Sequence, residues 1–197
     1  MDAFPTLTRY LHGLPHGLAS YPEVQQKASV ARNMLESLPE RMDADGLPAP
    51  IAKLVEDPPP PSVWIPEAHG LGALLAIRDL FADDEQFLAH VRQATVALLS
   101  SPMYRMMMRL MSPRFLFQAG ARSWGKFHHG IEMEMLDVTG SSASLHLNYR
   151  PGLVDQLLAR AFAMAFEVAL SLSGSDGVEV VVKHWSADQA SIVGRWK

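Results

Sequence analysis

The sequence of 197 residues contains no cysteine. This absence excludes disulfide bonds, thiolate zinc sites, iron–sulfur clusters and cysteine nucleophiles. The chain also has little net charge, −4 at neutral pH with an isoelectric point near 6.0. No global basic field therefore favours nucleic acid or an anionic membrane surface as a partner. Because 48% of the residues are hydrophobic and only 19% are charged, the composition predicts a folded chain with a full core.

Targeting and membrane-spanning segments are also lacking. The first five residues, Met1 to Pro5, have neither the basic nor the long apolar stretch of a secretory signal. The most apolar helix-like run covers residues 159–172 and is interrupted by Glu167. It is shorter than the ~20 residues that a bilayer requires. We therefore expect a cytoplasmic protein without a membrane span.

The common catalytic signatures are missing as well. The sequence has no phosphate-binding loop, no H-E-x-x-H motif and no G-x-S-x-G elbow, and Gly70-Leu71-Gly72 supplies only two glycines of a dinucleotide fingerprint. Glu132 and Glu134 share a strand face, a pattern more typical of exposed carboxylates than of a glycosidase-like pair. We expect no catalytic residue, no metal site and no enzyme. A site assembled from distant residues is the alternative that the sequence leaves open.

Proline is frequent in the first third of the chain. A helical pattern follows Pro22 and ends at Pro39, and the run Pro58 to Pro61 must be extended because each proline disfavours helix at the residue before it. Such a run is typical of a stiff connector. We therefore predict a helical N-terminal segment over residues 1–62 and an α+β domain that binds a ligand over residues 63–197.

The second part changes from a helical to an alternating pattern. Asp83 is placed to cap one helix, and Ser112-Pro113 begins another that reaches about residue 126. Alternating residues predict strands at 132–135, 144–149, 178–185 and 190–196, with a long helix between the two pairs. The fold class is therefore α+β: N-terminal helices followed by a β-β-α-β-β antiparallel sheet unit packed on the helices.

Two histidines mark the end of the predicted helix at residues 112–126. His128 and His129 follow the aromatic residues Phe115, Trp124 and Phe127. A histidine near a helix C-terminus is favoured because its charged form complements the helix dipole. The alternative is that one imidazole faces a pocket, or ligates a haem. A third histidine, His184, is predicted to be half-buried by its parity in the strand.

Methionine is concentrated in one part of the chain. Seven of the 11 methionines lie between Met103 and Met135, and three are consecutive at residues 106–108. Methionine fills irregular gaps or lines adaptable binding surfaces. Because successive helical residues point about 100° apart, the three cannot all face one core. Core packing, a ligand pocket and a dimer face are the interpretations left open.

The residues Trp64 to Glu67, Ser112 to Phe115 and the closing hairpin through Gly194-Arg195-Trp196 resemble a myxobacterial paralogous family of unknown function. Its layout is similar to the ligand-binding fold shared by haem–nitric-oxide sensors, aromatic-effector sensors of bacterial activators and vesicle-tethering subunits. The resemblance covers about residues 64–197. It implies a domain that binds something in a pocket between helices and sheet.

The residues with which these related proteins bind haem or zinc are mostly missing from this sequence. The haem sensors clamp the haem propionates with a Tyr-x-Ser-x-Arg motif, whereas this chain has Tyr149-Arg150 without it. The aromatic-effector sensors bind zinc through cysteines, which are absent here. The tethering subunits use the fold as an assembly platform. We accordingly expect no cofactor.

The sequence predicts a non-enzymatic sensory or regulatory domain that binds a small hydrophobic ligand in a helix–sheet pocket. The alternative is a protein-interaction module that forms a homodimer or binds a protein partner and holds no ligand. The residues predicted to line the pocket cluster where the helices cross into the sheet, and they are Met107, Met111, Phe115, Trp124, Phe127 and His128.

Overall fold

A computed structural model describes residues 3–100 and 112–197. In the first of these ranges the elements are α1 (Pro5–Gly13), the 3-10 turn η1 (Gly17–Ala19), β1 (Gln25–Lys27), α2 (Ala28–Glu36), α3 (Ala49–Glu56), β2 (Trp64–Pro66), α4 (Glu67–Arg78) and α5 (Asp84–Leu99). In the second they are α7 (Pro113–Trp124), β3 (His128–His129), β4 (Glu132–Val138), β5 (Ser142–Asn148), α8 (Gln156–Ser171), β6 (Glu179–Trp185) and β7 (Gln189–Arg195).

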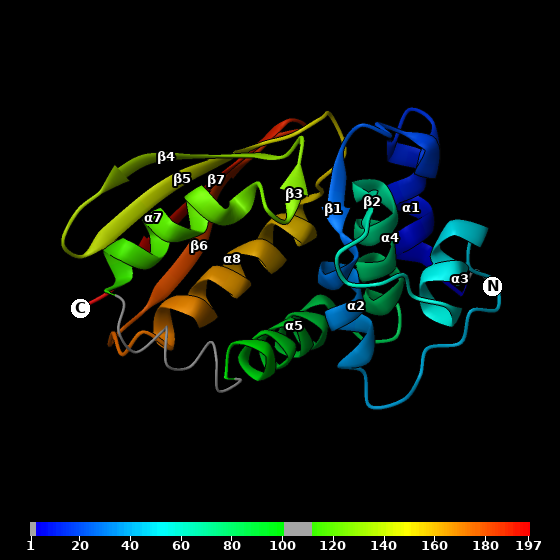
Figure 1. Ribbon diagram of the computed structural model, residues 1–197, viewed down its shortest axis with the longest axis horizontal. Helices are drawn as coiled ribbons and strands as arrows, with labels where there is room; N and C mark the ends of the chain where they lie inside the picture. The colour runs from blue at the N-terminus through cyan, green and yellow to red at the C-terminus, as the bar shows by residue number, and fades with distance from the viewer. Residues whose placement is uncertain (1–2, 101–111) are drawn as a thin grey trace.

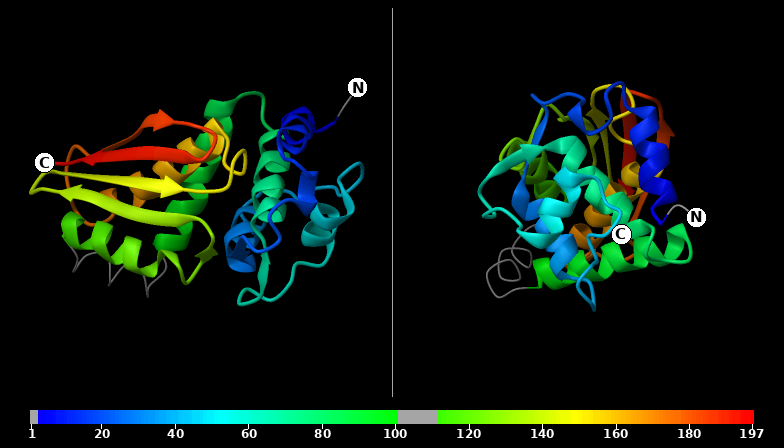
Figure 2. Two further views of the ribbon diagram at one scale, coloured as in Figure 1. Left: turned by 90° about the horizontal axis from the view of Figure 1, so that it is seen from above. Right: turned by 90° about the vertical axis from the view of Figure 1, so that its right-hand side faces the viewer.

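The larger sheet confirms the predicted α+β class and the β-β-α-β-β order. Its strands lie in the order β4-β5-β7-β6, and all neighbours are antiparallel. Helices α7 and α8 lie along one face of this sheet, α7 against β4 and α8 against β6, while α5 packs on α8 (Figures 1 and 2). Along β5, Ala143, Leu145 and Leu147 point into the resulting core and are buried.

Local sequence signals explain where the helices around this sheet begin. The Asp83 carboxylate accepts a hydrogen bond from the backbone N–H of Gln86 at 2.8 Å, and Ser112 Oγ accepts one from Phe115 N at 3.3 Å. Both caps were expected from the sequence, because each satisfies a backbone donor of the first helical turn. Asp155 caps α8 in the same way, at 2.7 Å from Leu158 N.

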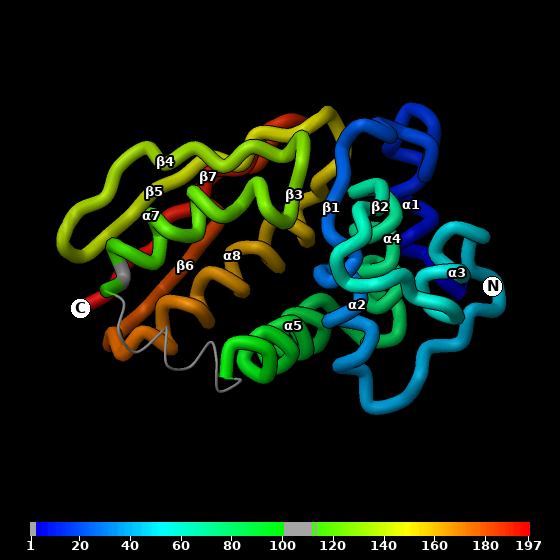
Figure 3. Tube along the Cα trace, viewed as in Figure 1, coloured from blue at the N-terminus to red at the C-terminus, as the bar shows by residue number. Residues whose placement is uncertain are grey.

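A second, smaller sheet was not predicted. Strand β1 lies between β2 and β3, antiparallel to both, so that Gln26 is paired with Ile65 on one side and His128 on the other. Figure 3 shows β3, which follows α7 in the chain, beside β1 of the N-terminal segment. The described part of the N-terminal segment, residues 3–62, thus packs on the remainder of the chain. Tyr10 adds a further contact, because its hydroxyl donates to the Leu153 carbonyl at 2.9 Å. The boundary at residue 62 stays a prediction.

His184 departs from its predicted place. The register of β6 against β7 shifts between Val182 and His184, and this irregularity breaks the strict alternation of faces on which the prediction relied. His184 is exposed. No helix among the described residues is both long and apolar enough to cross a membrane.

His69 and His90 lead us to expect that the free energy of unfolding depends on pH. Burial lowers the pKa of His90, which lies beside Ser37 and the Phe81 ring, and burial also lowers the pKa of His69. The fold favours the neutral imidazoles, so below about pH 6.5 the unfolded chain binds more protons than the folded one. We expect the free energy of unfolding to fall as the pH drops below 6.5, by at most about 1.4 kcal/mol per pH unit for each histidine.

Urea unfolding at several values between pH 7.5 and 5 measures this slope. The matched variant is His90→Gln, which keeps a polar side chain that does not titrate. We expect its slope to be shallower than that of the wild type below pH 6.5. Equal slopes in the two proteins would contradict the assignment to His90.

Candidate functional site

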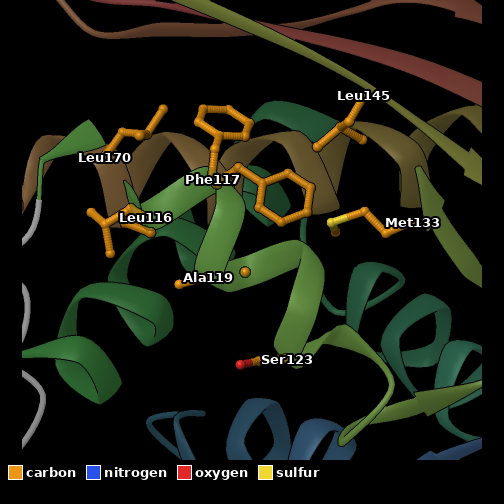
Figure 4. Close-up of a pocket in the computed structure, with 10 residues that line it drawn as sticks. Leu116, Phe117, Ala119, Ser123, Met133, Leu145 and Leu170 are labelled. Atoms are coloured by element: carbon orange, nitrogen blue, oxygen red, sulfur yellow. The ribbon is translucent and has the colours of Figure 1, made fainter. Parts of the chain in front are cut away.

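An apolar pocket of about 360 Å³ lies between α7 and α8, with strands β4 and β5 as its floor (Figure 4). The residues that line it come from these four elements and are Leu116, Phe117, Ala119, Gly120, Ser123, Met133, Leu145, Phe166, Ala169 and Leu170. This volume falls within the range of about 300–1,000 Å³ that is usual for small-molecule sites.

Small residues on α7 create the space. Leu116, Gly120 and Ser123 follow one another at helical spacing and lie on one face of the helix. A Cβ atom placed on Gly120 would meet nothing within 4 Å. The two helices therefore leave a gap where larger side chains on α7 would have filled it.

The inner wall of the pocket is fixed by close packing. Phe117 is buried, and its ring lies over Gly194 of β7, where an added Cβ would approach Phe117 Cζ to 2.8 Å. The ring also stacks on Trp196, with centroids 5.9 Å apart. Only glycine at position 194 allows this approach, so Phe117 is held in place and does not fill the pocket.

The pocket lining carries little polarity. Among the lining residues, Ser123 has the one side chain with a hydroxyl, and none has an ionisable group. The Ser123 hydroxyl has no hydrogen-bond partner within residues 3–100 and 112–197. Glu167 follows the lining residue Phe166, but its carboxylate is paired with Arg92 and accepts a hydrogen bond from Val180 N at 3.2 Å.

A buried polar cluster lies next to the pocket, at the small sheet. The Glu67 side chain is fully buried, and its carboxylate oxygens lie 3.1 and 3.2 Å from His128 Nδ1. Trp124 stacks on the His128 ring at 4.1 Å, and Phe162 meets that ring edge to face at 6.2 Å. Trp124 in turn packs against Phe166 of the pocket wall, at 6.2 Å. The aromatic rings thus connect the pocket to Glu67 on α4.

Gln26 is the second unusual polar residue of the cluster. Its side chain is fully buried, and within the described parts of the chain neither amide atom has a hydrogen-bond partner. It lies over Gly70, one turn after Glu67, where an added Cβ would come within 1.3 Å of Gln26 Nε2. Gly70 therefore makes the room that the Gln26 amide occupies.

Of the six predicted pocket residues, the four that the structure describes are not in the lining of the observed pocket. Trp124 and His128 belong to the adjoining cluster, while Phe115 and Phe127 are 46% and 42% exposed. Met107 and Met111 lie outside the described residues. The prediction that these six residues bind a ligand stays a prediction. The residues that sequence reasoning missed include Gly120 and Ser123, whose small side chains give no signal in an apolar pattern.

His128 has a different environment from the one expected of a helix C-terminus. Its Nδ1 lies against a buried carboxylate that is 61 residues away in the chain. The neighbouring His129 points to the other side of the strand, where it stacks on Trp64 at 3.7 Å. Lys27 Nζ lies 4.0 Å from the centre of the same Trp64 ring.

The pocket residues do not fit a haem. Iron would need an axial ligand such as histidine, cysteinate or tyrosinate, and the described lining residues offer none of these, with the Met133 thioether as their one weak donor. The two propionates would need cationic partners, which these residues also lack. Tyr149 and Arg150 are engaged elsewhere, with the Ser186 carbonyl and Glu23 respectively. No group of three or more acidic or histidine ligands forms a metal site among the described residues.

Comparison with known proteins finds similar solved structures only. No family model matches the chain, and no curated protein matches it. The H-NOX protein from K. algicida, in its Fe(II) unliganded form, has 10% sequence identity and a TM-score of 0.54, and a point mutant of that protein has 10% identity and a TM-score of 0.55. In both, the match covers 87% of this chain and 96% of the other.

A structure described as probing the function of haem distortion in the H-NOX family gives a TM-score of 0.57 at 9% identity, covering 87% of this chain and 95% of the other. Identities this low show the fold alone. The chain therefore has an α+β fold like that of the H-NOX domains.

Proposed function

We propose that the protein is a non-enzymatic sensory or regulatory domain that binds a small apolar ligand in the pocket between α7, α8 and the sheet. The observation that carries the proposal is the apolar lining of this pocket. Burying the apolar surface of a ligand against such walls is favourable at about 25 cal/mol per Å². The likeness to H-NOX domains supports a sensor, because one of those structures concerns the distortion of haem, a bound small molecule.

The path from the pocket to the N-terminal elements supports a regulatory role. Phe166 of the pocket wall packs on Trp124, Trp124 stacks on His128, and His128 bonds to Glu67 at the start of α4. A ligand that displaces Phe166 acts on this chain of contacts. Differential contacts of this kind are what allow a ligand to shift a conformational equilibrium.

The chemistry of the lining supports a binding domain over an enzyme. A hydrolytic or transfer site needs a nucleophile with a base in hydrogen-bond reach. Ser123 is the one hydroxyl of the lining, and no histidine or carboxylate is bonded to it among the described residues.

A cytoplasmic location belongs to the same proposal and is supported by the absence of cysteine.

Filling the pocket tests the proposal. The variant Gly120→Leu adds a side chain where the structure has open space, and Gly120 has ordinary helical backbone. We expect it to fold and to weaken binding of the neutral fluorescent probe N-phenyl-1-naphthylamine at least tenfold, because the leucine occupies the volume that the probe needs. Fluorescence titration measures the affinity.

The matched control is Gly13→Leu. Gly13 is also a helical glycine with nothing within 4 Å of its Cβ position, but it lies at the end of α1, away from the pocket. We expect it to bind the probe as the wild type does. If the wild-type protein shows no saturable binding, or if both variants bind equally well, the proposed function is wrong.

The interaction module remains the second candidate because apolar side chains are exposed on α7 and β4. Phe115 and Leu136 are 46% and 49% exposed, and within the described residues β4 pairs with β5 alone. Such positions are suited to a partner or a second copy. Sedimentation of the same samples distinguishes the two: a dimer that takes up no probe favours the interaction module.

A further inference from the structure

We propose that the pocket selects a neutral ligand with one hydrogen-bonding group, that this group binds the Ser123 hydroxyl, and that the pocket rejects carboxylates, including haem. The inference rests on the proposed function and specifies the class of ligand. It is carried by the charges and polar atoms around the pocket.

The pocket offers no counter-charge to an anionic ligand among the residues that the structure describes, because none of the lining side chains in 112–197 is cationic. Arg92 is paired with Glu167, which follows the lining residue Phe166 in α8. An unpaired carboxylate taken out of water into an apolar site loses its hydration with no compensating partner. A fatty acid or a haem propionate therefore lacks what it needs here.

One end of the pocket is polar, because Ser123 lies there. Ser123 lies seven residues after Leu116 on the same face of α7, which places the two residues about 10 Å apart along the helix. Figure 4 shows Ser123 at one end of the group, with Leu145 and Leu170 toward the other. The free hydroxyl can both donate and accept. A ligand with an apolar body and one alcohol, carbonyl or amine fits this arrangement.

The walls around the other end of the pocket are apolar. Phe117, Phe166, Leu145 and Leu170 are carbon surfaces with no polar side-chain atom. Phe117 is held by Gly194 and Trp196. A second polar group on the ligand would be buried without a partner there, which is unfavourable. The pocket thus selects among ligands by the number of polar groups that they carry, as well as by the charge of those groups.

A pair of probes of the same length tests the inference. 1-Decanol and decanoate, at pH 8, compete with N-phenyl-1-naphthylamine for the wild-type protein. We expect decanol to bind at least tenfold more tightly than decanoate. In the variant Ser123→Lys we expect the preference to reverse in favour of decanoate, because the new ammonium supplies the missing counter-charge. Position 123 is half-buried near the C-terminus of α7, where a cation is compatible with the helix dipole.

The matched control is Gln118→Lys. It adds the same charge to the same helix at a position outside the lining, and we expect it to keep the wild-type preference. Equal affinity of the wild type for decanol and decanoate, or stoichiometric uptake of added haemin, would overturn the inference while the proposed function stands. If the wild type binds neither the fluorescent probe nor decanol, the proposed function fails and the inference fails with it.

Discussion

Replacing Glu67 with alanine is expected to lower the free energy of unfolding by about 3–5 kcal/mol, the range measured when one partner of a buried pair is removed. Glu67 is fully buried and its carboxylate is the hydrogen-bond partner of His128 Nδ1. Without it, a buried imidazole nitrogen loses its partner, and a cavity remains at the start of α4. Urea unfolding followed by circular dichroism measures the change.

Two comparisons separate the pair from the loss of side-chain volume. Glu67→Gln keeps an acceptor of similar size, and we expect a smaller loss. Glu36→Ala removes the carboxylate of the exposed pair with Arg32, and a surface pair contributes about 0–1 kcal/mol. A double-mutant cycle with His128→Ala should show strong coupling, because the two side chains are in contact. Additive effects of the two substitutions would contradict the role assigned to the pair.

The variant Gln26→Leu is expected to stabilise the protein, in contrast to Glu67→Ala, and to raise the free energy of unfolding by about 1–3 kcal/mol. Burying a polar group without a hydrogen bond costs about this much, and an apolar side chain of similar shape removes that cost. The Gln26 amide is fully buried and has no partner among the described residues. The space above Gly70 that it occupies is compatible with a leucine.

Its matched control lies one residue away. Gln25→Leu changes the same residue type on the opposite, half-buried face of β1, and we expect an effect within about 0.5 kcal/mol, as for other surface changes. If Gln26→Leu instead destabilises the protein, the predicted cost of the unpaired amide is contradicted.

The sequence was most informative where a structure depends on neighbouring residues. The caps at Asp83 and Ser112 are local, since a short side chain bonds to a backbone N–H three residues later. The alternation of Met133 and Met135 with glutamates is a direct consequence of strand geometry. Such signals gave the helices around the larger sheet, its four strands and the α+β class.

The small sheet and the buried cluster depend on distant contacts. Strands of two or three residues are too short for an alternating pattern to be detected. Nothing local shows that Glu67 at a helix start is fully buried, because glutamate in a first turn is also typical of an exposed, favourable position. Its partner His128 follows a helix end, where a histidine is likewise compatible with an exposed position and with a buried one. Each residue has an ordinary local explanation, and only the fold brings them together.

Within the described residues, the observed pocket is lined by other residues than those that the sequence singled out. Large aromatic and methionine side chains suggested a binding site, whereas the space is made by Ala119, Gly120 and Ser123. A small residue on a helix is compatible with close packing, with exposure or with a cavity. Which of these applies is decided by how far apart the neighbouring helices lie.

The position of β1 in the middle of the small sheet has a consequence for how the chain folds as it is synthesised. Its residues Gln25–Lys27 pair with Trp64–Pro66 and with His128–His129, so the strand has neither partner when it is made. The last partner follows about a hundred residues later, and contacts of such long range slow folding. During that interval the nascent N-terminal helices have an unpaired strand edge, which is open to association with other chains. An aggregation risk of this kind arises during synthesis, before the finished fold has formed.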